Sequence, residues 1–423
     1  MIAPLASFVD RTALRRRYLG NRNRSAELFA LVEPRAYFDR PIPLRHPIVF
    51  YEGHIPAFSF NKLVREALGG PSIDPSLERL FERGIDPASV TDAARHERDA
   101  WPDPVRVRAF GAACDAAVLR ALATADLTDE GRSPMLAGAE TAYTILEHEE
   151  LHHETLLYLL HRLSLDRKRT SGRGGAYVEA APLSSGRVEV AAGHATLGMA
   201  RGAGFGWDNE FGETTVAVDA FEIDVNDVTN VEWLSFVRAG GPIPPFWIAR
   251  GGGFDLLCAF EQMSLPLTWP VYVTQAQAAA YAAWRRSRLP TEAEYHRAAY
   301  GTPSGEERLH PWGDEAPSAT HGNFDFRRFD PEPVGISPAG RSAWGVNDLV
   351  GNGWEWTTTT FEPLPGFAPM ASYPQYSADF FDGAHYVVKG ASPVSARTLV
   401  RRSFRNWYRP EYPYVYATFR TVN

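Results

Sequence analysis

Apolar and polar positions follow different patterns in the two halves of the chain. In residues 1–163 the apolar residues recur at three- and four-residue intervals, which is typical of amphipathic helices. Asp103 and Ser133 lie near two helix starts as expected N-caps. Four helices joined by moderate connections favour a helical bundle. The predicted helices cover residues 24–33, 45–66, 102–124 and 134–163, with a long loop over about residues 67–100.

Residues 187–423 contain short apolar runs that are broken by Gly, Pro, Asn and Asp. The runs VEVAAGHATLGM and TTVAVDAFEIDVNDVT alternate like strands, whereas TNVEWLSFVRAG and TQAQAAAYAAWRRSR indicate short helices. This texture predicts a loop-rich α+β domain. Residues 164–186 are rich in basic residues, Gly and Ser, which is typical of a linker. We therefore expect two domains, residues 1–170 and 187–423.

Composition excludes several classes of protein. The 423 residues carry a formal net charge of -8, which disfavours a nucleic-acid partner. The two cysteines, Cys114 and Cys258, can build neither a disulfide framework nor a cysteine-rich metal site. No apolar run is long enough to span a membrane and no signal peptide is visible, so we expect a cytoplasmic protein. Oligomeric state is left open.

The strongest chemical feature is the string EHEELHHE at residues 147–154. His148 and His152 are four residues apart and therefore lie on one face of a helix, on the stripe expected to face the bundle interior. A third histidine, His54, lies among apolar residues of the second predicted helix. Facing helices of a bundle commonly supply metal ligands from their inner faces. We therefore predict a metal site at His54, His148 and His152; the alternative is a solvated polar helix face.

The same string contains H-E-x-x-H, the zinc-hydrolase motif, in which Glu149 would be the general base. The metzincin form of that motif supplies a third ligand from a following G-x-x-H, and none follows here. A zinc hydrolase is therefore the remoter alternative. A third possibility is a binding module without catalysis or metal.

Several motifs of the second half follow one another in order, namely VDAFEIDVNDVTNVEWLSFV, RLPTEAEYHRAAYG, PWGD and GVNDLVGNGWEWTTT. Together they resemble the formylglycine-generating-enzyme-like domain, also called the sulfatase-modifying-factor fold. Gly351 and Gly353 are expected to allow tight backbone paths, and Trp354 and Trp356 to fill the core. Formylglycine-generating enzymes use cysteines near the C-terminus, and this chain has none after Cys258. The resemblance therefore implies the fold without that activity.

The first half resembles a DinB-like four-helix bundle. A bundle followed by a sulfatase-modifying-factor domain is the architecture of the ergothioneine and ovothiol synthases. The resemblance implies an Fe(II) enzyme that uses dioxygen to join sulfur to the imidazole of a histidine derivative. Their iron ligands correspond to His54, His148 and His152. Three imidazoles leave coordination positions open for substrates. His153 and Glu154 are expected to support the ligands or to lie at the surface.

The resemblance also implies substrate-binding residues at the interface of the two domains. The family's Asn-Trp pair corresponds to Asn406 and Trp407, followed here by Tyr408. An amide can bond an imidazole or carboxylate, and a Trp face attracts a trimethylammonium group. Arg106 lies where the family binds its thiol donor. A tyrosine near the iron corresponds to Tyr376 or Tyr373, which the sequence does not separate.

This chain differs from the family pattern at positions that bear on which molecule donates the sulfur atom. Ergothioneine synthases often carry Asp where this chain has Tyr408, Gln where it has Leu151, and R-G-G-S-W where it reads KGASP. The chain also ends without the methyltransferase domain usual in ovothiol synthases. These features favour the selenoneine-synthase branch, which joins hercynine (trimethylhistidine) to a selenosugar. An ergothioneine-type synthase using a thiol donor such as γ-glutamylcysteine or cysteine is the alternative. A structural calcium ion is a further possibility.

Overall fold

The computed structural model describes residues 9–82, 101–170 and 186–423. By its internal contacts the chain forms two compact units. The helical unit comprises residues 1–170 together with residues 370–374, and the C-terminal unit comprises residues 171–369 and 375–423. The expected linker lies largely in residues 171–185, outside the described residues.

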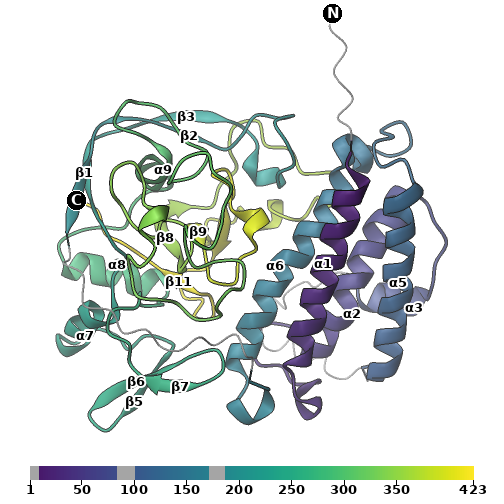
Figure 1. Cartoon of the computed structure of the whole chain (residues 1–423), viewed down its shortest axis with the longest axis horizontal. Coiled ribbons are helices and arrows are strands. Elements are labelled where there is room, and N and C mark those ends of the chain that lie inside the picture. The colour runs from purple at the N-terminus through teal and green to yellow at the C-terminus, as the bar shows by residue number, and fades with distance from the viewer. Residues whose placement is uncertain (1–8, 83–100, 171–185) are drawn as a thin grey trace, which may run out of the picture. The chain divides into compact units, whose positions relative to one another are not determined.

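The helical unit is a bundle in which α1 packs against α5 and α6, and α2 packs against the same two helices (Figure 1). The Asp103 carboxylate caps α5 by accepting from the Val105 N–H at 2.8 Å. Helix α6 is preceded by a 3₁₀ segment, Pro134–Ala139, in which Gly138 and Ala139 have positive φ. The helices are α1 Arg11–Ala30, α2 Ile48–Ser59 with a π-helical continuation Phe60–Ala67, α3 Pro75–Leu80, α5 Pro104–Thr124 and α6 Glu140–Arg162.

The first helix begins thirteen residues earlier than its predicted start at residue 24, so that prediction was wrong. Its inward stripe consists of Leu14, Tyr18, Asn21, Ser25 and Leu28. Two of these five side chains are polar, which hides the apolar period in the sequence. Both find partners on α6, because Asn21 donates to the Leu146 carbonyl and Ser25 bonds Glu149. The predicted loop 67–100 likewise contains the short helix α3, while residues 83–100 lie outside the described part.

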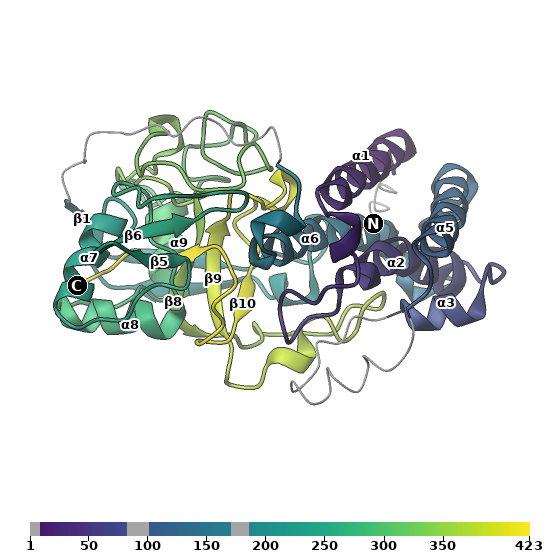
Figure 2. The same cartoon turned by 90° about the horizontal axis from the view of Figure 1, so that it is seen from below.

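In its described residues, 186–369 and 375–423, the C-terminal unit contains small sheets and three α-helices among long loops, which confirms the α+β prediction. Its central sheet has the order β10-β9-β8-β11, antiparallel except for the β8–β11 pair. Figure 2 shows β9 and β10 side by side. The strands are β1 Arg187–Val190, β2 Gly193–Leu197, β3 Thr214–Val218, β4 Phe221–Asp224, β5 Trp247–Arg250, β6 Gly253–Leu257, β7 Gln262–Ser264, β8 Gly353–Thr360, β9 Tyr386–Ala391, β10 Asn406–Tyr408 and β11 Ala417–Thr418; the helices are α7 Asn230–Arg238, α8 Gln275–Trp284 and α9 Glu292–Tyr300.

Large aromatic side chains fill the core of this unit. Trp354 and Trp356 on β8 are both buried. Gly351 has φ +96°, and a Cβ there would lie 2.9 Å from the Asn323 backbone. A Cβ on Gly353 would lie 2.8 Å from the Thr418 side chain on β11. These two glycines therefore permit the close backbone approach that was expected of them.

Candidate functional site

Three histidines converge inside the helical unit. His54 extends from α2, and His148 and His152 extend from α6. One nitrogen of each ring lies within 4.8 Å of the others, and in the described part of the chain no other group of three metal-ligating side chains meets this condition. The Nε2 atoms of His148 and His152 are 3.1 Å apart. Two nitrogens at about 2.1 Å from one ion at right angles would be separated by about 3.0 Å.

The arrangement of the ring nitrogens fits a metal ion. The Nδ1 atom of His54 lies 2.9 Å from the Phe81 carbonyl oxygen, which can only accept, so Nδ1 carries the proton and Nε2 keeps its lone pair. The Nδ1 atoms of His148 and His152 are shielded from solvent and have no hydrogen-bond partner. A divalent ion would use the Nε2 lone pairs, so this donor set fits one.

Burial keeps these imidazoles neutral. Burial lowers the pKa of His54 to about 4. It also lowers the pKa values of His148 and His152 well below the ordinary value, and the neighbouring histidines add to the effect. Metal binding requires the deprotonated ring. The cluster is therefore in its ligating form at neutral pH without competition from protons.

Ion pairs between half-buried arginines of α1 and buried carboxylates of α6 hold the histidine-bearing helix in place. Arg22 donates to Glu149 at 2.7 Å, and Arg17 donates to Glu150 at 2.6 and 2.8 Å. The Glu149 carboxylate also accepts from Ser25 at 2.6 Å. Arg22 and these hydrogen bonds lower the pKa of Glu149 against the opposing effect of burial. The carboxylate that a zinc hydrolase would use as a base is thus engaged by α1.

The two residues expected to support the ligands or lie at the surface are both buried. The Nε2 atom of His153 lies 2.9 Å from the Ser25 hydroxyl. Glu154 accepts a hydrogen bond from Tyr158 one turn further along α6. The His153 contact joins α6 to α1, whereas the Glu154 contact lies within α6.

Tyr373 lies beside the histidine cluster, although it is distant from it in sequence. Its ring centroid is 6.3 Å from that of His148 and 5.3 Å from that of Phe58. Phe58 in turn stacks on His148 with centroids 3.5 Å apart. Residues 370–374 belong to the helical unit, which explains how a residue of the second half reaches this cluster.

Two contacts with the start of α6 fix the segment that carries Tyr373. The Ser372 N–H donates to the Glu140 carboxylate at 2.7 Å. The Ser372 hydroxyl lies 2.9 Å from the Thr144 hydroxyl, and both residues are buried. Sequence reasoning missed these anchoring residues, because a serine beside a tyrosine carries no pattern that indicates its partner.

The other candidate tyrosine, Tyr376, lies in the C-terminal unit. Its ring stacks on buried Trp207 with centroids 3.8 Å apart, and it meets the Trp407 ring edge-on at 5.3 Å. Trp407 stacks on Phe361 at 4.1 Å. Tyr376 and Trp407 are half-buried, whereas Trp207 and Phe361 are buried. We call these four rings the aromatic wall.

Asn406 and Tyr408 flank Trp407 on β10 and are also half-buried. The Asn406 side-chain oxygen accepts from the Trp407 N–H at 2.9 Å, and its nitrogen donates to the Tyr408 hydroxyl at 3.2 Å. Arg106, by contrast, lies at the exposed start of α5 and donates to Asp74 at 3.0 Å. The structure thus brings Asn406, Trp407 and Tyr408 together with Tyr376 in one unit, and gives Arg106 a partner of its own.

Comparisons with known proteins match a different family to each of the two units. The family described as the sulfatase-modifying factor enzyme 1-like domain matches residues 177–423, and the DinB superfamily matches residues 17–156. A hercynine oxygenase of Mycobacterium tuberculosis is 34% identical over 411 residues, covering 89% of this chain and 91% of the relative. One of Mycolicibacterium thermoresistibile is 33% identical over 451 residues, covering 97% and 94%. Ergothioneine biosynthesis protein 1 of Schizosaccharomyces pombe is 27% identical, covering 90% of this chain and 52% of its own length.

Proposed function

Because the chain belongs to the hercynine oxygenase family, we propose that it is an Fe(II)- and dioxygen-dependent enzyme that joins a chalcogen donor to the imidazole of hercynine. The observation that carries this proposal is the cluster of His54, His148 and His152, whose neutral ring nitrogens converge. Among the described residues of the chain no carboxylate joins them. A set of three imidazoles leaves room for small molecules on the same ion.

Bound iron would supply the one-electron chemistry that a reaction with dioxygen requires. The chain's own residues have two roles around it. Phe58 covers the His148 ring and keeps water from that side. Tyr373 would provide a phenolic proton, because its ring lies beside the His148 ring.

Hercynine presents an imidazole, a carboxylate and a trimethylammonium group. We assign its recognition to Asn406 and Trp407, on the strength of the family resemblance. The amide of Asn406 offers both a donor and an acceptor. The half-buried face of Trp407 would attract the trimethylammonium group by a cation–π interaction. Its stacking on Phe361 gives that face a fixed orientation.

For the donor we propose a selenosugar. A C–Se bond would form as the ring C–H bond of hercynine and the Se–H bond of the donor break, with dioxygen as the oxidant: one oxygen atom leaves as water with both hydrogens and the other stays on selenium. A sugar has no pair of carboxylates to be clamped, whereas γ-glutamylcysteine does. Tyr408 supplies a neutral hydroxyl that contacts Asn406, at the position where ergothioneine synthases often carry Asp. Arg106, the cation expected to bind a thiol donor, pairs with Asp74 of the same chain. A thiol donor is the alternative.

The test uses the purified full chain loaded anaerobically with Fe(II). Dioxygen uptake is measured with hercynine and, in parallel, a selenosugar, γ-glutamylcysteine or cysteine, and products are identified by mass spectrometry. The proposal expects uptake only when hercynine and a donor are both present, and a selenium adduct. A sulfur adduct alone would reassign the enzyme as an ergothioneine-type synthase. Hydrolysis supported by zinc, with no effect of iron, would overturn the oxygenase proposal itself.

A further inference from the structure

A buried turn in the C-terminal unit holds both sides of the aromatic wall. The 3₁₀ turn Asp208–Glu210 follows Trp207 directly, and all three of its residues are buried. Buried polar groups of this kind are costly unless each is paired. Their partners lie on two segments that are separate in sequence. One segment includes Tyr376 and the other precedes Trp407.

The first segment is held through Ser377, the residue after Tyr376. The Ser377 hydroxyl donates to the Asp208 carboxylate and accepts from the Asn209 amide at 2.8 Å. Ser377 is completely buried. Because the Tyr376 ring also stacks on Trp207, this side of the wall is fixed both through the Ser377 side chain and through the Tyr376 ring.

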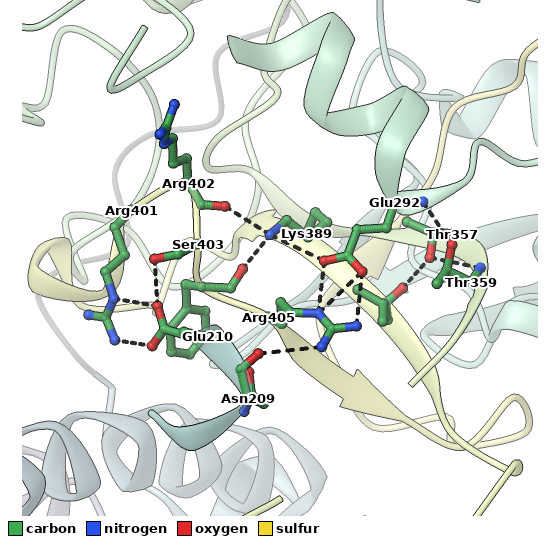
Figure 3. A network of polar contacts seen from close by, with 12 residues as sticks. Asn209, Glu210, Glu292, Thr357, Thr359, Lys389, Arg401, Arg402, Ser403 and Arg405 are labelled. Carbon is green, nitrogen blue, oxygen red and sulfur yellow. Dashed lines mark hydrogen bonds and ion pairs between the residues drawn. The ribbon is translucent and has the colours of Figure 1, made fainter. Parts of the chain in front are cut away.

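The second segment, residues 401–405, is held by Glu210 and by the carbonyl of Asn209. Glu210 accepts from Arg401 at 2.7 Å and from the Ser403 hydroxyl at 2.7 Å. Arg405 donates to the Asn209 carbonyl at 3.4 Å. Figure 3 shows Glu210 with Arg401 and Ser403, and Asn209 with Arg405.

A buried ion pair secures the end of this segment, immediately before Asn406 and Trp407. Arg405 binds the Glu292 carboxylate through Nε at 2.9 Å and Nη2 at 3.0 Å. Lys389, also buried, donates to the Arg402 carbonyl at 3.0 Å (Figure 3). It also donates to the Phe404 carbonyl at 2.6 Å. A shift of residues 402–405 would therefore stretch charge-assisted hydrogen bonds to Lys389 and Glu292.

We propose that the Asp208–Glu210 turn is a positioning device that sets the placement of Tyr376 relative to Trp407. The turn makes two sets of contacts, one through Ser377 and the other through Ser403, which we call its two arms. They fix the two segments whose rings make the edge-on contact. This inference rests on the proposed function in one respect, namely that Trp407 faces hercynine. The turn residues are positioning residues, since they act through the wall and not on the substrate.

The experiment removes one hydroxyl from each arm, in the variants Ser377→Ala and Ser403→Ala. Ser342→Ala is the matched control, because Ser342 is a buried serine whose hydroxyl bonds only a nearby backbone N–H, that of Val346. Each protein is loaded with Fe(II) without oxygen, and hercynine affinity is measured by calorimetry. Near-ultraviolet circular dichroism reports ring packing without ligand, and thermal unfolding reports stability.

We expect each arm variant to weaken hercynine affinity about 10-fold, which corresponds to one hydrogen bond to a charged group. The near-ultraviolet signal should change and iron stoichiometry should stay that of Ser342→Ala, while the unfolding midpoint should fall somewhat further than in Ser342→Ala, because each arm hydroxyl donates to a buried carboxylate. The double variant should lose less than the product of the two single losses, because both arms fix the same ring pair.

Two results would overturn the inference. One is an unchanged near-ultraviolet signal in both arm variants, which would show that the wall is positioned without the turn. The other is an equal loss of affinity in Ser342→Ala, which would show a general effect of removing a buried hydroxyl. If the unmodified protein fails to bind hercynine, the proposed function fails, but the circular dichroism comparison still decides the role of the turn.

Discussion

The Nε2 atoms of His148 and His152 face each other at 3.1 Å inside the helical unit. Two neutral imidazoles at this distance share at most one hydrogen bond, while the Nδ1 atoms have no partner. A divalent ion between the rings would satisfy both lone pairs at once, which is the physical reason to expect metal binding here.

Replacement of His152 by alanine should therefore weaken Fe(II) binding by roughly 100-fold or more, since loss of even a supporting residue costs 10–100-fold. Anaerobic titration with Fe(II) measures this, with about one equivalent bound by the unmodified chain. The control is His310→Ala in the C-terminal unit, where the ring stacks on Trp312. Undiminished Fe(II) affinity in the His152 variant would exclude the cluster as the metal site.

Tyr373→Phe removes the phenol beside His148 and keeps the ring. We expect kcat to fall roughly 100-fold, the usual contribution of a proton-transferring group, with little change in KM for hercynine. Tyr376→Phe is the matched comparison and should spare kcat, because that ring stacks on Trp207. Steady-state dioxygen uptake separates the two. A large fall in kcat for Tyr376→Phe alone would give the role to that residue.

Glu149→Gln tests the hydrolase alternative. Because Glu149 shares Arg22 with Asp115, the variant should lose roughly 2 kcal/mol of stability, in the range of one hydrogen bond between charged groups. Urea unfolding measures this, and Glu306→Gln on the C-terminal unit serves as the control. Unchanged stability together with complete loss of activity would instead point to a general base.

Asp348→Asn should make stability less dependent on pH. Burial raises the pKa of Asp348 to about 6, whereas the unfolded value is near 3.8. The native state thus binds more protons than the unfolded state between these values, so the contribution of this group is present below pH 3.8 and is lost as pH rises through 6. Relative to the unmodified protein, the variant should gain roughly 2–3 kcal/mol at pH 7.5 compared with pH 4.

The asparagine amide can still accept from the Gly335 N–H, and asparagine tolerates the positive φ of this position. Urea unfolding at the two pH values measures the change. A stability difference that stays constant with pH would show that Asp348 titrates normally.

Part of the architecture followed from local patterns. Helices α2, α5 and α6 were predicted because their inner faces repeat apolar residues, and the caps at Asp103 and Ser133 were visible in sequence. The start of α1 was missed because Asn21 and Ser25 occupy inner positions. A polar residue reads as exposed until its partner on another helix is known.

The sequence by itself determined the bundle followed by an α+β domain, and it singled out His54, His148 and His152 from their spacing and their resemblance to a family. These depend on residue type and on periodicity within one element. Tertiary structure decided which tyrosine lies beside His148, which carboxylate pairs with Arg22, and how Glu210 and Arg405 hold residues 401–407. Such contacts join residues more than a hundred positions apart, and their energies depend on burial and distance, which no local pattern encodes.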